Sequence, residues 1–416
     1  MIDFPLGTIP EHWEATTLGE ICRRGGGGIQ TGPFGSQLHA SDYVPDGIPS
    51  IMPVNIGENR ILRNGIACIT EEDAERLAQH RVKEGDIIYS RRGDVERRAL
   101  ICKNEAGWLC GTGCLKVRLG FGVVDPSFAS YQLGHPAVRQ WIVRHAVGAT
   151  MPNLNTGIMN AVPFALPPLP EQKAIAQILG TLDDKIELNR RMNATLERMA
   201  RALFKNYFPY SIMDKLPEGW TVFPLSKKIE ILSGGTPQTT EPLYWGGDIF
   251  WYSVKDAPVD ADIWVIQTEK TITQKGIDNS ATKILPENTT IISARGTVGK
   301  LALTGIPMAI NQSCYGIRGI NGYGQYFTYF RLQEAVSDLQ QRTHGTVFDT
   351  ITRQTFETLD CVFPPQKLAQ TFDKTVKPLL NKIRSNLFES YILAIIRDIV
   401  LSQLLNRKLH NLIDEE

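Results

Sequence analysis

The sequence predicts an α+β protein with two duplicated, mixed α/β heads. Two long helices separate them and pair as an antiparallel coiled coil with pseudo-two-fold symmetry. Three observations predict this fold. Segments from one half of the 416-residue chain return in the same order in the other half. Each half contains short β-rich runs punctuated by glycine and proline, and each half ends in a long helical stripe of apolar residues.

The internal repeat is the strongest signal in the sequence. The matching segments keep the same order in both halves, and the difference in residue number between each segment and its copy decreases gradually along the chain. Differences in loop length between two copies would produce this pattern, whereas chance matches would not stay in order. The segments and their returns are 9–13 and 216–220, 87–95 and 290–298, 114–118 and 314–318, and 167–168 and 364–365. The chain therefore divides into a head at 1–165, a helix at 166–208, a second head at 209–362 and a second helix at 363–416.

Each head is expected to be built mainly from short strands. Residues 86–90, 248–254 and 289–294 are runs of β-branched and aromatic residues that lie beside turn-forming residues. Such runs are typical of strands with at least one buried face.

The two long helices carry apolar residues at alternating spacings of three and four, which is typical of a coiled-coil interface. In the first helix these residues are Ile175, Ile178, Leu182, Met192, Leu196, Met199 and Leu203. In the second they are Leu379, Ile383, Leu387, Ala394, Leu401 and Leu405. The order head, helix, head, helix makes the pair antiparallel. The alternative is that they are ordinary core helices, but each is too long to be buried by its own head.

Composition excludes several classes of protein. The 44 basic and 44 acidic residues cancel, so the chain is not a simple polycation, although charge can still gather locally. Neither a signal peptide nor a membrane-spanning segment is evident, so a cytoplasmic protein without a membrane partner is expected. The seven cysteines are scattered and are expected to be buried free thiols, without a metal site.

No catalytic residues are expected. Residues 296–300 resemble a phosphate-binding loop only superficially, because Ala294 and Leu301 replace its required glycine and its Ser or Thr. The Pro-Pro pairs at 167–168 and 364–365 follow apolar residues, whereas an adenine methyltransferase needs a polar residue there to grip a flipped base. No cofactor site is expected in this chain.

Polar and basic residues on loops beside glycine and proline are the candidates for contacts with base edges and phosphates of DNA. In the first head they are Gln30, Gln37, Arg91, Arg92, Arg97 and Arg98. In the second head they are Gln238, Thr239, Lys255, Arg295, Lys300, Asn311 and Gln312. The alternative for each is a solvated polar loop. Arg92 and Arg295, which both precede a glycine, could instead be structural turn residues.

Together these features resemble the specificity subunit of type I restriction-modification systems over nearly the whole chain. The matching motifs are Pro-Glu-x-Trp at the start of each half, Pro-Phe-Gly-Ser at 33–36, Gly-Gly-Thr-Pro at 234–237, the Arg-Gly-x-Val turns, and the helix entry at 166–175. The last motif is the most specific one.

The resemblance implies a non-catalytic subunit whose two target-recognition domains each read half of a bipartite site in double-stranded DNA. It also implies that the helices set the spacer and dock two modification subunits, which methylate adenine with S-adenosylmethionine. A restriction subunit driven by ATP and magnesium would complete the assembly. The alternatives are a free-standing DNA modification or restriction enzyme, and a structural coiled-coil protein without DNA specificity.

Overall fold

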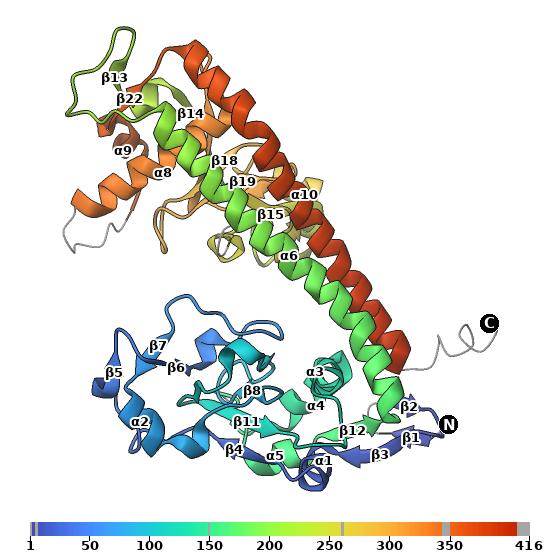
Figure 1. Ribbon diagram of the computed structural model, residues 1–416. Helices are drawn as coiled ribbons and strands as arrows, with labels where there is room; N and C mark the ends of the chain where they lie inside the picture. The colour runs from blue at the N-terminus through green and yellow to red at the C-terminus, as the bar shows by residue number, and fades with distance from the viewer. Residues whose placement is uncertain (1, 5–6, 149, 259–261, 343–349, 406–416) are drawn as a thin grey trace. The chain divides into compact units, whose positions relative to one another are not determined.

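The computed structural model describes the chain except for residues 1, 5–6, 149, 259–261, 343–349 and 406–416 (Figure 1). The chain forms two compact units, residues 1–184 with 393–416, and residues 185–392. Each of the long helices, α6 (Leu169–Tyr207) and α10 (Gln366–Leu405), contributes residues to both units. The last part of the predicted helical segment 363–416, from residue 406, lies outside the described residues.

The head of the first unit contains two four-stranded sheets. One has the order β4 (Gly28–Thr31), β11 (Cys114–Arg118), β8 (Ile87–Ser90) and β9 (Arg98–Leu100). The other has the order β10 (Leu109–Cys110), β6 (Ile48–Ile51), β7 (Ala67–Ile69) and β5 (Tyr43–Val44). Two short pairs complete the strands: β1 (Ile2–Phe4) with β2 (Gly7–Ile9), and β3 (Glu14–Thr17) with β12 (Pro163–Leu166).

The head of the second unit repeats this plan. Its main sheet has the order β14 (Ile229–Ser233), β21 (Cys314–Gly319), β18 (Thr290–Ser293), β19 (Leu301–Thr304) and β16 (Trp264–Val265). A smaller sheet has the order β17 (Lys270–Ile272), β15 (Trp245–Tyr252) and β20 (Ala309–Ile310). The strands β13 (Thr221–Pro224) and β22 (Asp360–Phe363) form the remaining pair.

Short helices cover these sheets. In the first unit they are α1 (Leu18–Arg24), α2 (Glu71–Arg76), α3 (Pro126–Leu133), α4 (Pro136–His145) and α5 (Thr156–Asn160). In the second unit they are α7 (Gln274–Asp278), α8 (Gln325–Arg342) and α9 (Arg353–Thr358). The local sequence explains why α3 begins where it does. The Asp125 carboxylate accepts a hydrogen bond from the Phe128 N–H at 2.9 Å, and Pro126 takes the first helical position.

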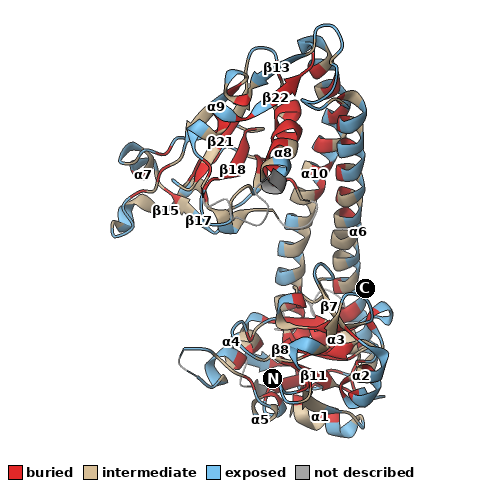
Figure 2. Ribbon diagram, turned by 90° about the vertical axis from the view of Figure 1, so that its left-hand side faces the viewer, coloured by how far each residue is buried: buried red, intermediate tan, exposed pale blue. Residues whose placement is uncertain are grey.

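The matching strand orders confirm the predicted duplication. The antiparallel run β4-β11-β8-β9 corresponds to β14-β21-β18-β19, and the parallel pair of β10 with β6 corresponds to that of β20 with β15. All four residues of β8 and all four of β18 are buried, so these strands are the centres of their cores (Figure 2). Apolar runs of this kind are expected where both faces of a strand are covered.

The long helices pack against each other in antiparallel fashion within each unit. In the second unit, Asn189 Nδ2 donates to Glu389 Oε2 at 2.9 Å, and Asn386 Nδ2 donates to Asn193 Oδ1 at 2.9 Å. In the first unit, Arg397 of α10 forms an ion pair with Asp183 of α6 at 2.8 Å. Residue numbers rise along one helix as they fall along the other, which confirms the predicted pairing.

The residues at this interface differ in part from the prediction. Ile178 and Met199 are 47% and 48% exposed, whereas Asn193 and Ala200 are buried. Asn193 can be buried because its Oδ1 accepts a hydrogen bond from Asn386 Nδ2 of the other helix, so a polar residue occupies an interface position that an apolar pattern does not predict.

Candidate nucleic-acid interface

In the first head, loops that are far apart in sequence meet at one edge of the main sheet. We call residues 32–38, 91–97, 111–113 and 151–154 loop cluster one. Because β4 and β8 both run antiparallel to β11, they end where β11 begins. The Arg91 N–H donates to Gly113 O at 2.8 Å, and the Leu154 N–H donates to Arg91 O at 2.9 Å. Gly32 permits the close approach, since a Cβ there would lie 2.1 Å from Gly111 O.

The second head forms the corresponding loop cluster two from residues 234–240, 294–300, 311–313 and 350–351. The Ala294 N–H donates to Ser313 O at 2.7 Å, and the Ile351 N–H donates to Ala294 O at 2.9 Å. Gly234 again permits the approach, because a Cβ there would lie 2.0 Å from Asn311 O. The two heads therefore present the same backbone construction with different side chains.

Arg91 is held in place by its neighbours in loop cluster one. Its Nε donates to Leu154 O at 3.1 Å, and its guanidinium lies 5.6 Å from the centroid of the Phe34 ring. The Phe34 ring is 54% exposed, and the Phe34 N–H donates to Gln37 Oε1 at 3.0 Å. Gln37 thus closes the turn that presents Phe34, and Arg91 stacks on an aromatic face at the surface of the head.

The remaining candidates of the first head, Arg92, Arg97, Gln30 and Arg98, lie in different environments. Arg92 is exposed in loop cluster one, where its backbone bridges to Asn153. Arg97 is exposed in the same cluster and forms an ion pair with Asp94 at 2.7 Å. Gln30 is half-buried within β4 and pairs with Lys116, away from the loops.

Arg98 is a correction to the sequence-based prediction. Its side chain is buried, its Nε donates to Ser130 O at 2.8 Å, and burial lowers the pKa of its guanidinium. Because the Arg98 guanidinium already donates to a buried carbonyl, Arg98 is a structural residue of the core and is not available to contact DNA.

The second head places most of its candidates in loop cluster two. Gln312 is exposed, and its Oε1 accepts a hydrogen bond from the Thr236 hydroxyl, while Asn311 Oδ1 accepts from the Ser313 N–H at 3.1 Å. Arg295 and Lys300 are exposed on the turn after β18. Gln238 and Thr239 are exposed after β14, and Gln238 Nε2 donates to Thr240 Oγ1 at 3.0 Å.

Lys255 lies on the turn after β15, beside loop cluster two, because the Asn311 N–H donates to Tyr252 O at the end of that strand. In the first head, Val54 takes the corresponding position after β6 and is 73% exposed. Val54, Phe34 and Met151 are exposed apolar residues that the choice of polar candidates missed. The signal for Phe34 was present in the Pro-Phe-Gly-Ser motif, where an aromatic residue lies between turn-forming residues.

Three of the buried cysteines have thiols of low reactivity. Burial raises the pKa of the Cys110, Cys314 and Cys361 thiols to about 12, so they remain protonated near neutral pH. All seven cysteines are free, as predicted, but Cys102 is exposed and Cys68 is half-buried. Within the described part of the chain, no group of His, Cys, Asp and Glu side chains could hold a metal ion, and no helix is long and apolar enough to cross a membrane.

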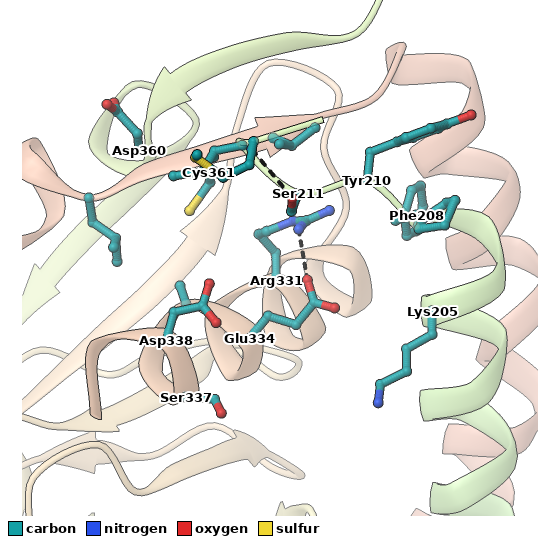
Figure 3. A pocket seen from close by; sticks show the side chains of 16 residues that line it. Lys205, Phe208, Tyr210, Ser211, Arg331, Glu334, Ser337, Asp338, Asp360 and Cys361 are labelled. Atoms are coloured by element: carbon teal, nitrogen blue, oxygen red, sulfur yellow. Dashed lines mark hydrogen bonds and ion pairs between the residues drawn. The ribbon is translucent and has the colours of Figure 1, made fainter. Parts of the chain in front are cut away.

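A cavity of about 790 Å³ lies in the second unit between the end of α6, α8 and β22. Figure 3 shows Arg331 and Glu334 of α8 in this cavity, with Lys205 of α6 facing them. Arg331 Nη1 pairs with Glu334 Oε2 at 2.7 Å, and its guanidinium lies 5.1 Å from the centroid of the Phe204 ring. Burial lowers the pKa of Arg331 and raises that of Glu334. Arg331 is almost fully buried and its guanidinium lies against the Phe204 ring, so this side chain packs α8 against α6, whereas its ion pair with Glu334 lies within α8.

Comparisons with known proteins agree with the duplicated fold. The family model described as the type I restriction modification DNA specificity domain matches residues 10–198 and 217–387. The HindI specificity subunit of Haemophilus influenzae is 22% identical, over 95% of this chain and 99% of its own length. The MjaIX specificity subunit of Methanocaldococcus jannaschii is 24% identical, over 96% of this chain and 94% of its own length.

A solved structure shows the same fold. The S subunit of a type I restriction-modification system from M. genitalium superposes with a TM-score of 0.56 at 16% identity, covering 97% of this chain and 99% of that one.

Proposed function

The chain belongs to the family of type I restriction modification DNA specificity domains, and from this premise we propose that each head reads one half of a bipartite site in double-stranded DNA. One observation carries the proposal: the family model matches once in each half of the chain, and each match contains one of the two loop clusters. Two heads with the same backbone and different side chains suit two different ligands of one class.

The chemistry of the loop clusters supports DNA as that ligand. Exposed cations beside each cluster can contact phosphates without reading sequence. These cations are Arg92 and Arg97 in the first head, and Lys255, Arg295 and Lys300 in the second. Loops with arginine and amide side chains can contact base edges. Net charge is zero, so the attraction to DNA is local to these loops.

We further propose that the chain acts within an assembly and supplies no catalytic step itself. Two modification subunits would methylate adenine with S-adenosylmethionine, and a restriction subunit would use ATP and magnesium. The helices α6 and α10, which are continuous through both units, would set the spacer between the half-sites. A cytoplasmic location would fit a protein that acts on host DNA.

Exposed apolar residues on α10 support the proposal that the chain binds a protein partner. Tyr391, Ile392, Ile395, Ile396 and Ile399 are each more than 40% exposed. Their spacings place them on one side of the helix. A continuous apolar stripe of this kind on a helix surface marks a site of protein contact.

Selection from random duplex DNA tests the proposed function. The chain assembled with its modification subunit is expected to enrich one motif with two specified blocks separated by an unspecified spacer. The chain alone should leave DNA unmethylated and uncut. Methylation or cleavage by the chain alone would favour a free-standing enzyme, and an assembly that binds without enriching any motif would favour a scaffold without DNA specificity.

A further inference from the structure

The two loop clusters carry different side chains at the same three backbone positions. Ser90 and Ser293 end the equivalent strands β8 and β18, and they pair with Cys114 and Cys314. This register makes Ala294 the counterpart of Arg91.

The same register gives the other two positions. Thr112 and Gln312 each lie two residues before the paired cysteine, so they are counterparts. Phe34 and Thr236 each follow the closely packed glycine of their cluster by two residues. The first head therefore has Phe-Arg-Thr where the second has Thr-Ala-Gln.

The first cluster presents an arginine fork. Nε of Arg91 is engaged with Leu154 O, and the guanidinium stacks on Phe34. Among the described residues, neither Nη atom of Arg91 has a hydrogen-bond acceptor. The two Nη groups are thus free donors at the end of a side chain whose orientation is already fixed. A fork of this geometry matches the O6 and N7 acceptors of guanine in the major groove.

The second cluster presents an amide. The Thr236 hydroxyl donates to Gln312 Oε1, which orients the amide plane, and the adjoining turn is closed by the Ser313 N–H donating to Asn311 Oδ1. Ala294 is small and buried, so no arginine occupies the position beside Gln312. A glutamine amide that offers one acceptor and two donors matches the N6 and N7 groups of adenine.

Resting on the proposed function, we infer that the half-site of the first head contains a guanine read by Arg91, and that of the second head contains an adenine read by Gln312. Phe34 is a positioning residue, which keeps the Arg91 fork aimed outward. The exposed arginines Arg92 and Arg295, which are counterparts and precede glycines with φ of 74° and 78°, contact phosphate and read no base.

Base preferences of the assembled complex test this inference when each variant is selected against random duplexes. Arg91→Ala should lower the preference for guanine at one position of one half-site by roughly five- to hundredfold, the range of a single bidentate contact. Gln312→Ala should relax one adenine in the other half-site to a similar degree. Phe34→Leu should partly relax the same position as Arg91→Ala. In each case the untouched half-site is the internal control.

Matched controls are Arg92→Ala and Arg295→Ala. Each should weaken binding to all sequences alike, reduce the slope of affinity against salt by about one unit, and leave every specified base unchanged. Thermal melting of each variant confirms folding.

The inference is wrong if Arg91→Ala relaxes no position, relaxes a base other than guanine, or relaxes both half-sites. It is equally wrong if Gln312→Ala leaves the adenine preference intact. In these cases a bipartite motif for the unaltered complex would still uphold the proposed function. If the unaltered complex enriched no bipartite motif, the proposed function itself would be wrong.

Discussion

Phe204→Ala is expected to destabilise the second unit strongly. Phe204 lies on α6, is 2% exposed, and packs against a cluster of aromatic rings. Its ring centroid lies 4.9 Å from Phe208, 5.5 Å from Phe330 and 5.4 Å from Phe372. Truncation of a buried phenylalanine costs about 3–5 kcal/mol, which is a large share of the about 5–15 kcal/mol that stabilises a domain.

The loss should be concentrated in the second unit, because Phe204 of α6 packs there against Phe330 of α8 and Phe372 of α10. The buried Arg331 also loses the ring on which its guanidinium lies. Urea unfolding followed by hydrogen exchange of each unit measures this effect. Phe223→Ala is the control, since Phe223 is 39% exposed on β13 and should cost less than about 1 kcal/mol. A loss of that small size for Phe204→Ala would contradict the packing described for α6.

The double variant Ile395→Asp with Ile399→Asp is expected to abolish assembly with the modification subunit while leaving the chain folded. The two side chains are 42% and 51% exposed and lie one helical turn apart on α10. Placing two carboxylates in an apolar contact removes the buried area and adds uncompensated charge, so the affinity should fall by more than about a hundredfold.

Size-exclusion chromatography and titration of the two purified proteins give this affinity. Ser385→Asp is the control, because Ser385 is an exposed polar residue on α10 outside the apolar stretch 391–399. Unchanged assembly by the double variant would show that the modification subunit docks elsewhere on the chain.

The duplication and the antiparallel pairing of the helices could be predicted from the sequence because both depend on order along the chain. The detailed helix interface could not. Asn193 is a polar residue in an apolar pattern, and its burial depends on Asn386, which lies 193 residues further along the chain. The residue pattern of one helix cannot show that the other helix supplies a hydrogen bond to its buried asparagine.

The same limit applies to the loop clusters. Arg97 and Arg98 are neighbours of the same type, yet one is exposed and the other is buried under Ser130 of α3. Phe34 and Arg91 stack only because the main sheet brings the ends of β4 and β8 together. The sequence did not separate loop from strand for every candidate, since Gln30 lies within β4 and Arg98 within β9, and which side chains face outward depends on tertiary contacts.

Two heads with equivalent folds are expected to read two separate halves of one DNA site. Methylome sequencing of a host that carries this chain with its modification subunit measures this most directly. We expect a single motif in which two specified blocks flank a spacer of fixed length, with methylated adenine in the motif. In a host carrying the Arg91→Ala chain, only one block should lose specificity. A single uninterrupted motif, or a change in the first head that alters both blocks, would contradict independent reading by the two heads.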